Sequence, residues 1–147
     1  MKKFLMTLLL AVFTVAGIAN AAAPKGWETD FDKALAKAKA ERKYVYVLFT
    51  GSDWCGWCVK LRKNVLDNKK FKKFAEQKLV PVYCDFPRKN NLPESQIRKN
   101  RKLQQSLNAP RGFPGAVVVS PEGKVVGKIS GYRDCNDYIK ELKRFAK

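Results

Sequence analysis

The chain alternates between short, continuous apolar runs and longer polar segments in which apolar residues recur every three or four positions. Two of the runs, 44–50 (YVYVLFT) and 79–84 (LVPVYC), are rich in β-branched and aromatic residues and predict buried strands. A third run, 116–120, is separated from a fourth, 125–130, by the turn sequence Pro-Glu-Gly-Lys. These last two runs predict a β-hairpin.

The polar segments between the runs predict helices. Apolar positions at helical spacing place them, in chain order, at 31–38, 58–65, 68–77, 94–107 and 134–145. Because the first two strands are joined through helices, they are expected to pair in parallel with a right-handed crossover, while the terminal hairpin adds antiparallel strands. The expected fold class is therefore α/β, a three-layer α/β/α sandwich with a central mixed sheet.

The N-terminal segment has a different pattern. Two lysines precede an almost unbroken apolar run, 4–18, and Ala19-Asn20-Ala21 then supplies small residues where a signal peptidase cuts. We therefore interpret 1–21 as a signal peptide, cleaved near Ala21, and 22–147 as the folded domain of a periplasmic or secreted protein. The alternative is an uncleaved membrane anchor, although the apolar run is short for a membrane span.

The composition adds a strong positive charge. The sequence holds 30 Lys and Arg against 13 Asp and Glu, and removal of the first 21 residues with their two lysines leaves 28 against 13, a net charge of +15. Such a balance favours acidic partners, anionic lipid or nucleic acid. The basic residues are spread over several segments with acids between them, which is typical of solvated helix faces, and an exported protein rarely meets nucleic acid. We therefore expect no nucleic-acid partner.

The absence of histidine from the sequence excludes a histidine-based triad, a histidine general base and a histidine metal ligand. The sequence does hold a pair of cysteines in Cys55-Gly56-Trp57-Cys58, which follows a predicted strand and opens a predicted helix. Thiols at this spacing can close a disulfide, and the free N–H groups at a helix start favour the thiolate of the first cysteine. We expect Cys55 to be the nucleophile and Cys58 the resolving thiol.

A zinc site uses the same cysteine spacing but needs two further ligands. The remaining cysteines, Cys84 and Cys135, are 51 residues apart and neither belongs to a second pair, so we expect no metal. Cys84 ends a predicted strand and is interpreted as an inert buried thiol rather than a second site. Two alternatives stay open, a Cys84–Cys135 disulfide and a purely structural role for the first pair.

Two segments resemble a known family. The segments 49–58 (FTGSDWCGWC) and 112–115 (GFPG) are similar to the active-site strand and the cis-proline loop of thioredoxin-like proteins. The segment 85–87 with the charged helix that follows it resembles periplasmic DsbH-type thiol-disulfide oxidoreductases. The resemblance covers the chain from about Trp27 to the last helix and implies a thioredoxin fold.

The resemblance also implies site residues. Pro114 is expected to be cis and to lie beside Cys55, so that the backbone of Phe113 is presented to an extended substrate; an ordinary turn proline is the alternative. The expected substrate-binding residues are Trp54, Gly56, Trp57, Phe113 and Pro114, with core packing as the alternative for the tryptophans.

The sequence departs from the family pattern in two ways. Thioredoxins carry a buried aspartate where this chain has Phe49, which leaves water or Asp53 to assist proton transfer. The dipeptide between the cysteines is Gly-Trp rather than Gly-Pro, and its identity helps to set the redox poise.

The implied function is reduction of protein disulfides by a monomer without a cofactor, recharged by a membrane electron donor of the DsbD type. A disulfide-donating oxidase is an alternative. An isomerase is another, although the chain has no room for a second domain that dimerises or binds unfolded chains. A different class is a non-enzymatic, basic binding module in which the cysteine pair is a structural disulfide.

Overall fold

The computed structural model describes residues 23–147, so the predicted signal peptide and its cleavage site lie outside the described residues. The elements, in chain order, are α1 (Phe31–Glu41), β1 (Tyr44–Thr50), α2 (Gly56–Leu61), the π-helical turn η1 (Arg62–Leu66), α3 (Lys69–Lys78), β2 (Leu79–Asp85), α4 (Glu94–Ser106), β3 (Gly115–Val119), β4 (Val125–Ser130) and α5 (Cys135–Phe145). The predicted order is confirmed, and η1 prolongs α2 rather than adding a separate element. Within 23–147, no helix has the length and apolar character needed to cross a membrane.

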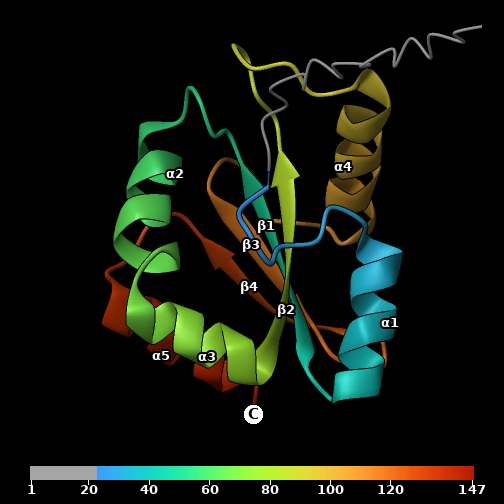
Figure 1. Cartoon of the computed structure of the whole chain (residues 1–147), viewed down its shortest axis with the longest axis vertical. Coiled ribbons are helices and arrows are strands. Elements are labelled where there is room, and N and C mark those ends of the chain that lie inside the picture. Colours follow the sequence, from blue (N-terminus) through green and yellow to red (C-terminus); the bar gives the residue numbers. More distant parts are fainter. Residues whose placement is uncertain (1–22) are drawn as a thin grey trace, which may run out of the picture.

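The four strands form one mixed sheet in the order β2-β1-β3-β4. β1 and β2 are parallel, whereas β3 is antiparallel to both β1 and β4, as predicted. The register places Thr50 opposite Asp85, and Phe49 opposite both Cys84 and Gly115. The carboxyl ends of β1 and β2 therefore lie side by side at one end of the sheet, where the β1–α2 and β2–α4 connections leave it (top of Figure 1).

Helices cover both faces of this sheet, which confirms the three-layer sandwich. In Figure 1, α1 and α4 lie on one side of the sheet, and α2, α3 and α5 lie on the other. Successive residues of β1 supply both layers because strand side chains alternate. Val45, Val47 and Phe49 pack with α1 and α4, while Tyr46 and Leu48 pack with the other helices.

The helix starts follow from the sequence. The carboxylate of Asp30 accepts the backbone N–H of Lys33 (3.1 Å) and caps α1, and the side chain of Asn68 accepts that of Lys70 (2.9 Å) and caps α3. α2 differs because its N-cap residue is Cys55, whose sulfur stands where a capping oxygen usually lies. A cysteine is thereby fixed at the start of a helix.

The outer edge of β2 is covered by the segment that precedes α1. The backbone N–H of Glu28 donates to the carbonyl of Pro81 (2.9 Å), and the N–H of Tyr83 donates to the carbonyl of Glu28 (2.8 Å). Pro81 itself has no N–H to offer at this edge. The chain thus adds a one-residue bridge in parallel to β2, between Glu28 and Val82.

Candidate functional site

Cys55 and Cys58 form a disulfide at the end of β1 and the start of α2. Their Cα atoms are 5.2 Å apart, and the backbone N–H of Cys58 lies 3.3 Å from the sulfur of Cys55. Cys55 is 7% exposed and Cys58 is 2% exposed. The two predicted cysteines are therefore brought together, with Cys55 as the more accessible of the two.

The loop before the disulfide is held by a buried carboxylate that the sequence reasoning missed. Asp85, the last residue of β2, is 1% exposed. Its two oxygens accept the backbone N–H of Ser52 (3.0 Å) and the hydroxyl of Ser52 (2.5 Å). The backbone carbonyl of Asp85 accepts the side-chain amide of Asn100 (2.9 Å), which ties α4 to the same point. The available signal was a charged residue that directly ends an apolar strand.

Asp53 ties the same loop to the β2–α4 connection. Its carboxylate accepts the backbone N–H groups of Arg88 (2.9 Å), Lys89 (2.7 Å) and Asn90 (2.7 Å). These hydrogen bonds, that of Arg88 foremost, lower the pKa of the Asp53 carboxyl because they stabilise its charged form. A carboxylate engaged in this way is a poor proton acceptor, so Asp53 anchors the β2–α4 connection instead of assisting proton transfer.

Trp54 lies half-buried against three neighbours. Its indole N–H donates to the carbonyl of Phe86 (2.7 Å), and its ring meets the ring of Phe113 edge to face at 5.6 Å. The guanidinium carbon of Arg88 lies 3.9 Å from the ring centroid. The backbone at Gly51 approaches the ring so closely that a Cβ there would collide with it. Trp54 is thus fixed in a local cluster whose members Phe86 and Phe113 also pack against the core beneath α1 and α4.

Trp57 lies on the surface, so the core-packing alternative is wrong for this residue. Its side chain is 58% exposed. One ring face stacks on Tyr132 from the β4–α5 connection, with a centroid distance of 5.7 Å and an interplanar angle of 29°. The ammonium nitrogen of Lys60 lies 5.1 Å from the Trp57 centroid and 4.8 Å from that of Tyr132. Gly56, also exposed, has open space where a side chain would begin.

The Phe113–Pro114 peptide bond is cis, as the resemblance implied. Pro114 is buried directly before β3, and Gly112, two residues earlier, has a φ of +86°, a conformation that favours glycine. Phe113 packs against Phe86, at 5.4 Å between ring centroids, as well as against Trp54. The loop before β3 therefore meets the β2–α4 connection on the Trp54 side of the disulfide loop.

The two remaining cysteines lie in different layers. Cys84 belongs to the core beneath α1 and α4, while Cys135 packs at the margin of the core beneath α3 and α5. Both are free thiols, so the alternative of a Cys84–Cys135 disulfide is wrong. Burial raises the pKa of Cys84 to about 12, which makes this thiol inert at neutral pH. Within residues 23–147, no group of three Cys, Asp or Glu side chains could hold a metal ion.

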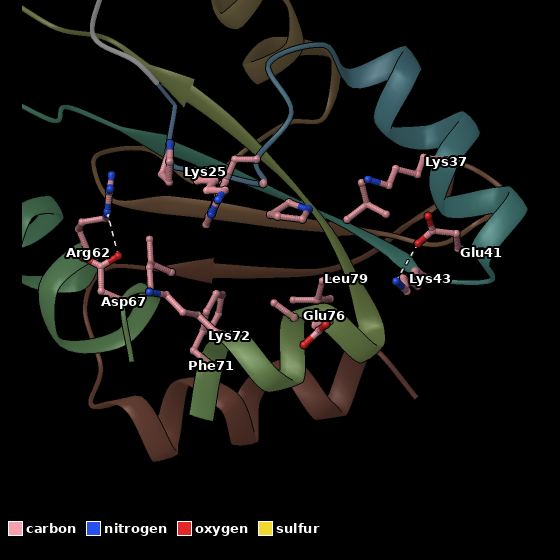
Figure 2. A pocket seen from close by; sticks show the side chains of 17 residues that line it. Lys25, Lys37, Glu41, Lys43, Arg62, Asp67, Phe71, Lys72, Glu76 and Leu79 are labelled. Atoms are coloured by element: carbon pink, nitrogen blue, oxygen red, sulfur yellow. Dashed lines mark hydrogen bonds and ion pairs between the residues drawn. The ribbon is translucent and has the colours of Figure 1, made fainter. Parts of the chain in front are cut away.

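A hollow of about 650 Å³ lies away from the disulfide, between the segment before α1 and the edge of β2 (Figure 2). Two ion pairs lie among the residues that line it, Lys43–Glu41 at 2.7 Å and Arg62–Asp67 at 3.3 Å. None of its lining residues comes from the loops around the disulfide. We therefore place the candidate site at Cys55–Cys58 and its flanks rather than in this hollow.

Comparison with known proteins gives concordant matches. Residues 31–146 match the family model described as a thioredoxin-like domain. The chain is 40% identical over 109 residues to the disulfide bond reductase DsbH of Chlamydia pneumoniae, and 29% identical over 106 residues to the thioredoxin-related protein DsbJ of the same organism. These alignments cover 74% and 72% of this chain but 64% and 30% of the relatives, so the chain spans less than two thirds of the length of either.

A solved structure of a DsbH oxidoreductase matches with a TM-score of 0.75 and 36% sequence identity, over 86% of this chain and 87% of that chain. This match covers most of the length of both chains. With the family model, it shows that the chain has the thioredoxin fold and belongs to the thioredoxin-like family.

Proposed function

We propose that this protein is a thiol-disulfide oxidoreductase and that it reduces disulfides in protein substrates. The observation that carries the proposal is the Cys55–Cys58 disulfide at a helix start, with Cys55 the more exposed partner. Backbone N–H groups at that position stabilise a thiolate, which is the reactive form in disulfide exchange. The name of the relative DsbH, a disulfide bond reductase, supports the same direction.

In the proposed cycle the reduced protein reacts first through Cys55. Its thiolate attacks one sulfur of the substrate disulfide, forms a mixed disulfide and releases the other substrate sulfur as a thiolate, which takes up a proton. The thiol of Cys58 then loses its proton and attacks the sulfur of Cys55, which releases the second substrate thiolate. Two electrons have passed to the substrate, and the protein is left with the Cys55–Cys58 disulfide.

The cycle closes only when an external dithiol reduces that disulfide again. We propose a membrane electron donor of the DsbD type for this step, and export to the periplasm or beyond with removal of 1–21. We assign substrate contact to Trp54, Gly56, Trp57, Phe113 and Pro114, which surround the cysteines or precede β3. An extended substrate strand would run along the backbone before Pro114.

The reduction potential of the Cys55–Cys58 pair tests both the activity and its direction. Equilibration of the protein comprising 22–147 against glutathione or dithiothreitol should give a value near that of thioredoxin, about −270 mV. A value near about −120 mV would instead identify a disulfide donor. The absence of a reversible couple would leave the disulfide a structural element.

A second measurement separates catalysis from binding. Cys55→Ser should abolish reduction of a protein disulfide such as those of insulin, because no thiolate remains to attack. Cys84→Ser is the matched control, since this thiol is buried and takes no part in the proposed cycle. If the unchanged protein and Cys55→Ser both failed to reduce the substrate, the basic binding module would be favoured.

A further inference from the structure

Cations held over aromatic rings, with no acidic partner among the described residues, flank the disulfide on both sides. On one side the guanidinium of Arg88 lies 3.9 Å from the ring centroid of Trp54, the residue before Cys55. On the other side Lys60 lies over Trp57, between the cysteines, and over Tyr132. Arg88 and Lys60 take part in none of the salt bridges found within residues 23–147.

The carboxylates near the disulfide are engaged elsewhere. Asp85 is buried beneath Ser52, and both of its oxygens accept hydrogen bonds from that residue. Asp53 accepts three backbone N–H groups of the β2–α4 connection. Asp134 accepts the hydroxyl of Tyr132 (3.1 Å) at the start of α5, where a helix N-terminus offsets its charge. The negative charges of the site are therefore satisfied by the protein itself, whereas Lys60 and Arg88 are offered to a partner.

The aromatic rings make these cations more effective. A Lys or Arg over a ring face is held in place without being neutralised, because the ring contributes only a quadrupole. Lys60 stands over two rings whose own stacking fixes the site, so its position is set before a partner arrives. A carboxylate of a bound polypeptide that approaches Trp57 would meet a preorganised ammonium group instead of a freely rotating one.

We propose that the disulfides this protein prefers lie in acidic polypeptide segments, with Asp or Glu side chains close to the cysteines, and that Lys60 is the residue that selects them. This inference rests on the proposed function and names its substrate class. Arg88 contributes on the Trp54 side. The net charge of +15 left without the first 21 residues attracts such segments from a distance, while Lys60 discriminates between them at contact.

The test uses three disulfide peptides that are identical except for Glu, Gln or Lys beside the cysteines. Oxidation of the reduced protein by each peptide is followed by tryptophan fluorescence, which gives the rate constant. The rate constant for reduction of each peptide by uncharged dithiothreitol is measured as a reference, because flanking charges change the reactivity of the peptide disulfide itself. After this correction, the Glu peptide should react about tenfold faster than the Lys peptide at low salt, and the ratio should shrink severalfold at an ionic strength of about 0.5 M.

Lys60→Gln and Lys60→Glu should lower this ratio about threefold and about tenfold, respectively. The matched controls are Lys39→Gln and Lys39→Glu, which change the net charge equally on an exposed position of α1, on the other face of the sheet. Equal reactivity of the Glu and Lys peptides with the unchanged protein would overturn the inference. So would an equal loss of preference in the Lys60 and Lys39 variants, because the effect would then be one of bulk charge. Failure of all three peptides to react would instead remove the proposed function on which the inference rests.

Discussion

The two tryptophans beside the disulfide lie in opposite kinds of surroundings. Trp54 is hydrogen-bonded to the carbonyl of Phe86, packed against Phe113 and covered by Arg88. Trp57 makes one stacking contact with Tyr132 and is 58% exposed. The same side chain thus joins three loops on one flank and is displayed to solvent on the other.

This difference shows how one site can be held rigidly on one flank and remain accessible to a partner on the other. The Trp54 flank is built from bonds that link connections distant in sequence, so it fixes where the disulfide stands. The Trp57 flank offers apolar area and a cation that a partner can cover. Substitutions on the first flank should therefore affect stability, whereas those on the second should affect reactivity toward polypeptides.

The largest expected difference lies between the tryptophans themselves. Trp54→Ala should lower the free energy of unfolding by about 3 kcal/mol, because it removes a packed ring and leaves the Phe86 carbonyl without its donor. Trp57→Ala should change it by less than about 1 kcal/mol while slowing exchange with peptide disulfides. Urea unfolding of the oxidised proteins measures the first quantity. Equal losses of stability would show that Trp57 is as structural as Trp54.

A smaller difference in stability is expected between the two glycines that flank the loop before the disulfide, Gly51 and Gly56. Gly51→Ala should cost about 2 kcal/mol, because the new Cβ overlaps the Trp54 ring and must displace it. Gly56→Ala places its Cβ in open space at the first position of α2 and should be neutral or slightly stabilising. Thermal unfolding with tryptophan fluorescence reports both changes. A neutral Gly51→Ala would mean that the ring moves freely, against its assignment to a fixed cluster.

The smallest expected effect is the pH dependence due to Asp53. Its pKa is lower in the folded protein than in the unfolded chain, so its contribution to stability is present at neutral pH. That contribution should fade as the pH falls through the folded pKa, below the ordinary value of 3.8. Unfolding of the protein and of Asp53→Asn at pH 7, 5 and 3 tests this sign. The difference in free energy of unfolding between the two proteins should be largest at pH 7. A difference that stays constant with pH would assign the effect to hydrogen bonding that does not depend on the charge of Asp53.

The fold was open to prediction because its signals are local. The runs 44–50 and 79–84 are β-branched and continuous, as strands buried on both faces must be, and both are strands of the central sheet. Gly123 marks the turn of the predicted hairpin with a φ of +87°. What pattern reading missed is η1, because the buried residues Cys58, Leu61 and Val65 keep the three- and four-residue spacing of an α-helix across the boundary between α2 and η1.

The cysteine pair at the centre of the site could also be predicted from the sequence, but the residues that surround it could not. The spacing of Cys55 and Cys58 is shared with zinc sites, but the absence of histidine and the isolation of the other two cysteines favoured a disulfide. Asp85, Arg88 and Tyr132 lie between 30 and 77 positions beyond Cys55, and they reach the site only through strand register and loop packing. A pattern in one sequence carries no record of such contacts, so sequence reasoning assigned Asp53 to proton transfer as an option, although its hydrogen bonds place it in loop anchoring.

The coverage of β2 by Glu28 bears on how the protein can be handled. An exposed strand edge with free N–H and C=O groups can add a strand from another molecule and start aggregation. Here residue 28 occupies that edge between Pro81 and Tyr83. A shortened version that starts at Thr29 would keep all four cysteines and every regular helix and strand, yet it would expose the N–H of Tyr83 at the edge of the sheet. Truncations intended for crystallisation should therefore begin no later than Trp27.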